Sequence, residues 1–269
     1  MIDPELQQII DNWRLPDGKT LLDRIEIMIQ PAVMEGHFSS SPTAILCGLQ
    51  YHLGGDKDTE ELAHLASLTS KDNVLDVCCY LGGPAIQLAD TFRCRVTGAD
   101  IVEKFVIAAS RIAGVSGLSH LVDFRVADAA KLPFEDGQFT VVWNQCSLNH
   151  DEAWLQEFNR VLSPGGRMAM TFEIRGDNPD EHSDRWSLQD IINLLQDMEY
   201  SVEHAEDITE RDIEIGWKAL DRELSEREEE FTVVFGVDWI RKAHEEFAGE
   251  INRMRQGRWG NGRIVATKT

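Results

Sequence analysis

Short β-branched segments alternate with helix-like segments through the middle of the chain, and this alternation limits the possible fold more than any other feature. A strand that is followed by a crossover helix returns to the sheet parallel to itself, and the helices then cover both faces of the sheet. The sequence therefore predicts an α/β fold with a mostly parallel, Rossmann-like sheet. The five strands predicted here are 73–78, 95–100, 122–126, 139–144 and 167–172.

The C-terminal part has a different pattern of predicted secondary structure. We expect a helix, a sixth strand, two long acidic helices and a seventh strand, over 186–198, 201–205, 209–230, 236–256 and 263–267. A helical pair inserted before the last strand of an open sheet can cover its carboxyl edge as a lid. Before the sheet, apolar periodicity predicts helices around 25–29 and over 58–68. Four units are predicted. Residues 1–70 are a helical segment over the active site, and residues 71–205 are the ligand-binding core. Residues 206–257 are a lid insertion, and residues 258–269 are the last strand of the core sheet.

Composition excludes several classes of protein. The chain has 269 residues, of which 42% are hydrophobic, enough for one large core. Its formal charge is −21, from 47 acidic and 26 basic residues, so nucleic acid and anionic membranes are not expected partners. No apolar run approaches the ~20 residues of a membrane helix, and the acidic N-terminus does not resemble a secretory signal. Five cysteines without paired spacing indicate reduced thiols, no metal site and a cytoplasmic protein. The sequence leaves the oligomeric state open between a monomer and a homodimer.

Four polar features follow predicted strands. They are the glycine-containing turn in VLDVCCYLGGP at 74–84, then Asp100, then the pair Asp128 and Ala129, and finally WNQCSLNH at 143–150. In parallel sheets, ligands bind beyond the carboxyl ends of the strands. A turn that opens a helix offers backbone N–H groups, and a carboxylate one strand further on can accept two hydrogen bonds from a ribose diol. The four features together predict a nucleotide-like ligand at this edge.

The segment 74–172 resembles the core of the class I methyltransferases, which bind S-adenosyl-L-methionine (SAM). The matching motifs are VLDV…GGPA, VTGAD at 96–100, DAAKLPFEDGQFTVVW at 128–143 and RVLSPGGR at 160–167. The tail resembles the sarcosine/dimethylglycine methyltransferase type through AEDIT at 205–209, RELSEREEE at 222–230 and GRIVA at 262–266. LQYHLGG at 49–55 resembles that family's substrate-side segment.

The resemblance implies a role for each matching residue. Asp76 and the 78–83 turn would hold the methionine part of SAM. Asp100 and Ile101 would hold the ribose and flank the adenine, which Asp128 and Ala129 would also contact. Asn144 and Gln145 would stand near the sulfonium. The implied cofactor-binding residues are Asp76, Cys78, Tyr80, Gly82, Asp100, Ile101, Asp128, Ala129, Asn144 and Gln145.

The chain departs from the family pattern in two places. Cys78 and Tyr80 stand where the family has the glycines of Gly-x-Gly, and glycine is the residue that adopts positive φ without strain. An acidic residue of related amine methyltransferases is replaced by Cys146. The first departure bears on the cofactor, and the second bears on whether the acceptor is a cationic amine.

Three residues are candidate catalytic groups. His150, after the fourth strand, could be a general base or a residue at a helix start. Tyr51 and His52 could cover the active site or pack against the N-terminal helices. Other side chains have two open interpretations, pocket or packing: Trp217, Trp239 and Trp259 as substrate walls, and Arg222, Arg258 and Arg263 as a carboxylate clamp. Cys78 and Cys79 are interpreted as small turn residues rather than ligands of a soft metalloid.

The sequence supports a methyltransferase that acts on a small molecule, with nitrogen slightly preferred as the accepting atom. One alternative is C-, O- or S-methylation in secondary metabolism or soft-element detoxification, suggested by Cys146 and His150. A second alternative is a protein with this fold and no methyltransferase activity, suggested by Cys78 and Tyr80.

Overall fold

The computed structural model describes residues 41–269, so the helix expected around residues 25–29 lies outside the described residues. A seven-stranded sheet forms the centre, in the order β3-β2-β1-β4-β5-β7-β6. β7 runs antiparallel to both of its neighbours, and the other pairings are parallel. The strands are β1 Asn73–Val77, β2 Arg95–Asp100, β3 Val122–Val126, β4 Phe139–Gln145, β5 Leu162–Arg175, β6 Tyr200–Asp207 and β7 Trp259–Lys268. The predicted mostly parallel α/β sheet is confirmed.

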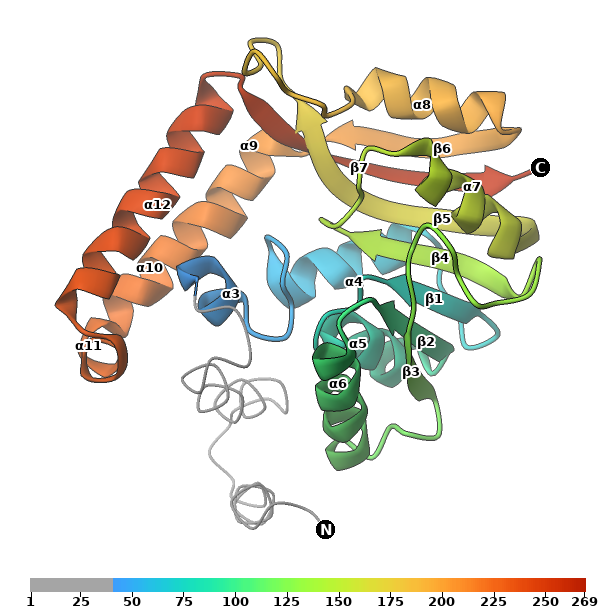
Figure 1. Ribbon diagram of the computed structural model, residues 1–269, viewed down its shortest axis with the longest axis horizontal. Coiled ribbons are helices and arrows are strands. Elements are labelled where there is room, and N and C mark those ends of the chain that lie inside the picture. Colours follow the sequence, from blue (N-terminus) through green and yellow to red (C-terminus); the bar gives the residue numbers. More distant parts are fainter. Residues whose placement is uncertain (1–40) are drawn as a thin grey trace.

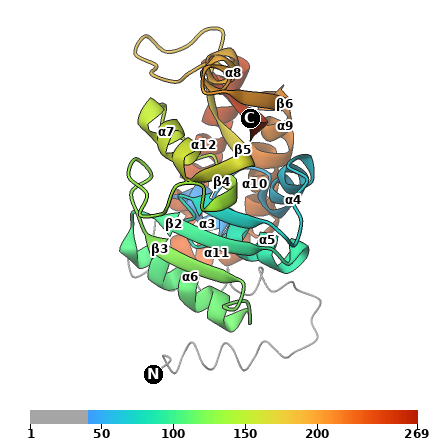
Figure 2. The same ribbon diagram turned by 90° about the vertical axis from the view of Figure 1, so that its right-hand side faces the viewer.

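Helices cover both faces of this sheet (Figures 1 and 2). Neighbouring strand residues alternate between two buried clusters, so that Val74 packs on one face and Leu75 on the other. The first face is covered by α4 Gly55–Leu65, α5 Gly83–Phe92 and α6 Glu103–Val115. The second is covered by α7 Glu152–Val161 and α8 Leu188–Asp197.

A third layer of helices lies beside the end of the sheet to which β4 and β5 point (Figure 1). It has its own apolar core, which includes Leu46, Trp217, Phe231 and Phe247, and Leu53 of the segment before α4 packs into this core. The layer consists of α3 Pro42–Cys47, α9 Thr209–Asp212, a π-helical turn Ile213–Trp217, α10 Lys218–Glu226, α11 Glu228–Phe235 and α12 Val237–Arg255. In residues 41–269, none of the helices is both long and apolar enough to span a membrane.

The first of the two predicted long helices is not continuous. The prediction of one helix over 209–230 was wrong only at its end: helical backbone runs from 209 to 226 through the π-helical turn and breaks at Arg227, after which α11 begins. Gly216 lies in the π-helical turn and packs closely on the preceding segment, because a Cβ at this position would lie 2.8 Å from the Cβ of Leu53. The second predicted helix, over 236–256, is present as α12.

Candidate functional site

The turn after β1 keeps the backbone of a glycine-rich motif although two of its residues are not glycine. Cys78, Tyr80 and Gly82 have φ of 61°, 49° and 80°, all in the left-handed region. A non-glycine residue held there costs about 1–3 kcal/mol, so the surrounding contacts must stabilise the turn. One of those contacts is very close, because a Cβ on Gly83 would lie 2.2 Å from the carbonyl oxygen of Leu49. The cofactor turn and the segment that precedes α4 are therefore packed together.

Asp76 lies beneath this turn and has an unsatisfied oxygen. Its side chain is buried, and its Oδ2 has no hydrogen-bond partner within the described residues. Burial, together with the nearby charge of Asp100, raises the pKa of Asp76 to about 8. An unpaired buried carboxylate is costly, and a cationic ligand group would remove that cost. This orphaned oxygen fits the ammonium-bearing methionine end of SAM.

Asp100 ends β2 at the same edge of the sheet. Its two oxygens accept hydrogen bonds from the backbone N–H groups of Tyr80, at 3.0 Å, and Val102, at 2.9 Å. Burial raises the pKa of Asp100, while these backbone hydrogen bonds oppose the rise. Each oxygen keeps a lone pair with which it could meet a ribose hydroxyl.

The expected adenine side lies along the ends of β2 and β3. Ile101 is 68% exposed, and Val126 is half exposed, so these apolar side chains form an open wall. Asp128 is exposed and accepts a hydrogen bond from the N–H of Ala130, while Ala129 is buried. The sequence-predicted residues for ribose and adenine thus share one edge.

Asn144 and Gln145 are buried at the end of β4 in different settings. Asn144 donates from Nδ2 to the carbonyl of Val77 at 2.9 Å, and its Oδ1 has no partner among the described residues. Gln145 accepts hydrogen bonds from Trp143 and Thr59 and donates to the rest of a polar network. Gln145 therefore acts first as a structural junction.

That network crosses the molecule behind the site. Gln145 donates to Asp58, which pairs with Arg211 at 2.8 Å, and Arg211 pairs with Asp212 at 3.0 Å. Asp212 accepts a hydrogen bond of 2.7 Å from Nδ2 of Asn261. Burial and the neighbouring Asp58 raise the pKa of Asp212 to about 7. The network links β4 to α4, α9 and β7. Because the Nδ2 of Asn261 faces Asp212, the Oδ1 of the same amide faces away from Asp212.

Two cavities meet at the carboxyl edge of the sheet. A small one, of about 40 Å³, is lined by Asp76, the 78–80 turn, Leu49, Pro84 and Gln145. A larger one, of about 530 Å³, lies between the strand ends, α3 and α12, and is of the size of a small-molecule site. Three residues line both cavities: Tyr51, His52 and Ser147. The rings of Tyr51 and Tyr80 pack at 5.1 Å, so aromatic side chains form part of the small cavity's wall.

His52 is buried at this junction. Its Nδ1 lies 3.2 Å from the carbonyl oxygen of Leu53 and its Nε2 lies 3.0 Å from Oε1 of Gln50. Burial lowers the pKa of His52, although Asp58, 3.8 Å away, opposes this effect. The resting ring is therefore neutral near pH 7, while both of its nitrogens have an oxygen in reach if the ring gains a proton.

His150 is placed elsewhere. It lines neither of the two cavities, its Nδ1 accepts the backbone N–H of Trp186 at 3.0 Å, and its ring packs edge-on against the Trp186 indole. Burial lowers its pKa, followed by the charge of Arg185. The structure thus brings Tyr51 and His52 together, with His150 supporting the segment that carries Arg185.

The cysteines near the site are held as thiols. Burial raises the pKa of Cys78 to about 12, and burial also raises the pKa of Cys146. Cys146 lies at the end of β4 with φ of 53° and lines the larger cavity, as Cys47 of α3 does. Thiols that stay protonated near pH 7 are poor nucleophiles.

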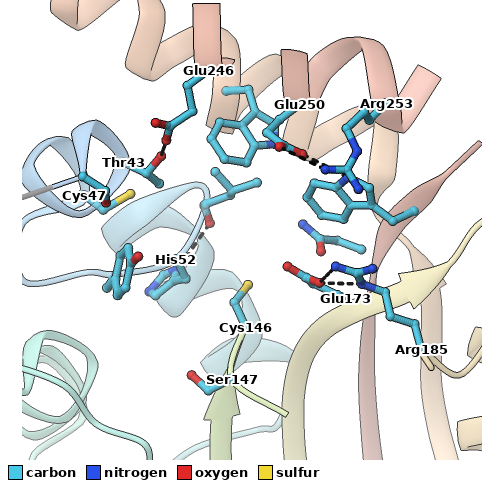
Figure 3. A pocket seen from close by; sticks show the side chains of 16 residues that line it. Thr43, Cys47, His52, Cys146, Ser147, Glu173, Arg185, Glu246, Glu250 and Arg253 are labelled. Atoms are coloured by element: carbon cyan, nitrogen blue, oxygen red, sulfur yellow. Dashed lines mark hydrogen bonds and ion pairs between the residues drawn. The ribbon is translucent and has the colours of Figure 1, made fainter. Parts of the chain in front are cut away.

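Much of the larger cavity was not foreseen from sequence. Of the tryptophans considered, Trp217 and Trp259 line the cavity, whereas Trp239 packs against Phe235 in the helical layer. None of the three arginines considered lines the cavity, and its charged residues are Glu173, Arg185, Glu246, Glu250 and Arg253 (Figure 3). The spacing of three of them could have been recognised in the sequence: residues 246, 250 and 253 are four and three apart, so they share a face of α12.

The comparisons with known proteins agree with this geometry. Residues 74–166 match the family described as "Methyltransferase domain". A curated relative, the 27-O-demethylrifamycin SV methyltransferase of Amycolatopsis mediterranei, is 40% identical over 115 residues, which are 42% of each chain. The chain therefore spans less than half the length of this relative.

Two solved structures share the fold. The phosphoethanolamine N-methyltransferase 2 of Haemonchus contortus has a TM-score of 0.78 at 17% identity, over 94% of this chain and 61% of that one. A Galdieria sulphuraria protein assigned as a sarcosine dimethylglycine methyltransferase has a TM-score of 0.69 at 20% identity, over 79% and 85%. The domain match and the sheet order lead to one conclusion: residues 74–166 form a methyltransferase domain, set in a Rossmann-like methyltransferase fold.

Proposed function

We propose that this protein transfers the methyl group of SAM to a small molecule held in the 530 Å³ cavity, with nitrogen as the preferred accepting atom. One observation carries the proposal: this cavity meets the cofactor-side cavity at Tyr51, His52 and Ser147. A molecule in the larger cavity would there face the methionine end of a cofactor held by Asp76 and the 78–83 turn. The acidic surface, with a formal charge of −21, favours a small-molecule partner over nucleic acid.

SAM supplies a methyl group that is already activated, so the protein's main task is alignment. The accepting atom must lie about 3 Å from the methyl carbon and in line with the bond that breaks. Residues of the segment 49–53 line both cavities, and with a cofactor and an acceptor bound they would help to exclude water from the junction. We extend the proposal to the helices of 209–256, which would open and close over the acceptor as a lid.

His52 is the residue proposed to receive the acceptor's proton. Its ring is neutral at rest and lines both cavities, and its protonated form would be stabilised by Leu53 O, Gln50 Oε1 and Asp58. Tyr51 would orient the acceptor from the same junction. His150 lies outside both linings, so the geometry favours His52 for this role.

The preference for nitrogen is supported by likeness to the phosphoethanolamine and sarcosine dimethylglycine enzymes. Oxygen is the rival accepting atom, supported by the local likeness to the rifamycin O-methyltransferase. The test is incubation with SAM carrying a labelled methyl group and a panel of amines, phenols and alcohols of fitting size. Label in an amine supports the proposal. Label only in hydroxyl compounds would replace nitrogen by oxygen, and no SAM binding in calorimetry would end the proposal.

A further inference from the structure

The wall of the 530 Å³ cavity carries more negative charge than its arginines neutralise. Its acidic residues are Glu173, Glu246 and Glu250, and its basic residues are Arg185 and Arg253. His52 also lines it but is held neutral by burial. Which of these charges can act on a ligand depends on how they are paired.

Both arginines are engaged with carboxylates of the protein. Arg185 donates to Glu173 at 2.6 Å, and its guanidinium lies 5.7 Å from the centre of the Trp259 ring. Arg253 donates to Asp180 at 3.0 Å and lies 3.5 Å from Glu250. A ligand carboxylate or phosphate would have to displace these partners, which makes the cavity a poor site for an anion.

Glu246 is the carboxylate of the cavity without a cationic partner among residues 41–269. It accepts a hydrogen bond of 2.6 Å from the hydroxyl of Thr43, which ties α12 to α3. In Figure 3, Glu246 and Thr43 lie on the α12 side of the cavity, across from Cys146 and Ser147. Because Ser147 belongs to the junction with the cofactor cavity, Glu246 lies on the wall away from the methyl-transfer point.

Two buried polar atoms in the same wall independently indicate a missing ligand. The indole Nε1 of Trp217 and the Oδ1 of Asn261 have no hydrogen-bond partner among the described residues, and the two residues are only 7% and 2% exposed. Unsatisfied buried polar groups cost about 1–3 kcal/mol each. A ligand group that accepts a hydrogen bond would satisfy the Trp217 N–H, and a group that donates one, such as an ammonium, would satisfy the Asn261 oxygen.

We propose that the methyl acceptor carries a cationic nitrogen at the end away from its accepting atom, and that Glu246 is the residue that selects for this charge. The inference rests on the proposed function, because it takes this cavity as the acceptor site. The acceptor is then a two-ended molecule, with a cation against Glu246 and a nucleophile at the Tyr51–His52 junction.

The test uses three probes of matched size, namely 4-phenylbutylamine, 4-phenylbutan-1-ol and 4-phenylbutyrate, titrated into the full chain saturated with S-adenosylhomocysteine. We expect the amine to bind at least tenfold more tightly than the alcohol, and the carboxylate to bind most weakly. Glu246→Gln keeps the shape and the Thr43 hydrogen bond but removes the charge. It should weaken the amine about tenfold and leave the alcohol within twofold.

Glu245→Gln is the matched control, since Glu245 is the next residue of α12, pairs with Arg241 and faces solvent. Equal losses in the two variants would mean that only the long-range charge matters, and the proposal would fall. Equal affinity of the wild type for amine and alcohol, or tighter binding of the carboxylate, would overturn it without any variant. S-adenosylhomocysteine affinity is measured separately, so a failure of the proposed function, seen as no cofactor binding, remains distinct from a failure of amine selectivity.

Discussion

Tyr80 offers a direct test of the cofactor turn, because two substitutions at this position separate its ring from its backbone. Tyr80→Ala removes the ring and keeps a Cβ at φ of 49°. Tyr80→Gly removes the ring and the Cβ. The difference between the two variants reports the cost of holding a non-glycine residue in the left-handed conformation.

The contacts of the ring set the magnitude of the first change. The Tyr80 ring packs at 5.1 Å on Tyr51 and at 4.6 Å on Phe105. Aromatic pairs contribute about 0.5–1.5 kcal/mol each, and the half-buried ring loses apolar burial as well. We expect Tyr80→Ala to lower the free energy of unfolding by about 2–4 kcal/mol.

Glycine at position 80 should recover part of this loss. Relief of the left-handed conformation is worth about 1–2 kcal/mol, and the greater freedom of glycine in the unfolded chain offsets about 0.4–1 kcal/mol. Tyr80→Gly should therefore be more stable than Tyr80→Ala by about 0.5–1 kcal/mol. The control is Ala108→Gly inside α6, where replacing alanine by glycine should lower the free energy of unfolding by about 1 kcal/mol, the opposite of its effect at position 80.

Urea unfolding gives the stabilities, and calorimetry with SAM gives the affinities, of the same proteins. If the free energy of unfolding of Tyr80→Ala equals or exceeds that of Tyr80→Gly, residue 80 does not adopt the left-handed conformation and the reasoning is refuted. We expect both variants to bind SAM about as well as the wild type and to methylate poorly, because Tyr80 shapes the wall between cofactor and acceptor. A tenfold gain in SAM affinity in Tyr80→Gly, about 1.4 kcal/mol, would instead make the ring an obstruction.

Four other predictions use independent measurements. Asp100→Ala should weaken SAM binding by about 1.5–3 kcal/mol in calorimetry, and unchanged affinity would remove Asp100 from the site. Because the pKa of Asp76 is raised to about 8 in the free protein, a cationic ligand group should displace its proton, and SAM binding near pH 7 should release protons. Calorimetric titrations in buffers of different ionisation enthalpy measure this release, which should be smaller in Asp76→Asn. His52→Asn should lower kcat more than KM. Because burial lowers the pKa of His52, the wild type should lose activity only at a pH below the ordinary histidine range, and the variant should lack this loss; an unchanged pH profile would exclude the base role. Hydrogen exchange over 209–256 should slow when SAM and acceptor bind, and equal exchange in both states would make these helices a fixed layer.

Local patterns in the sequence determined the sheet and its binding edge. The segments 95–100 and 122–126 are strands with the predicted bounds. Asp76 lies near the end of β1, Asp100 ends β2 and Asp128 follows β3. Strand periodicity and turn chemistry involve residues close together in the chain, so they can be read without the fold. The departure at Tyr80 was also visible in sequence, whereas the retained left-handed backbone was seen only in the structure.

Tertiary packing decided the acceptor side of the site. The helix expected over 209–230 breaks at Arg227 and contains a π-helical turn whose Gly216 packs closely on Leu53, a residue of a distant segment. The charge of the cavity depends on pairing: Arg185 is engaged with Glu173, while the partner of Glu246 within residues 41–269 is the hydroxyl of Thr43. Residue spacing along one segment does not specify which side chains from distant segments pair, because that choice is made when the helical layer packs against the sheet edge.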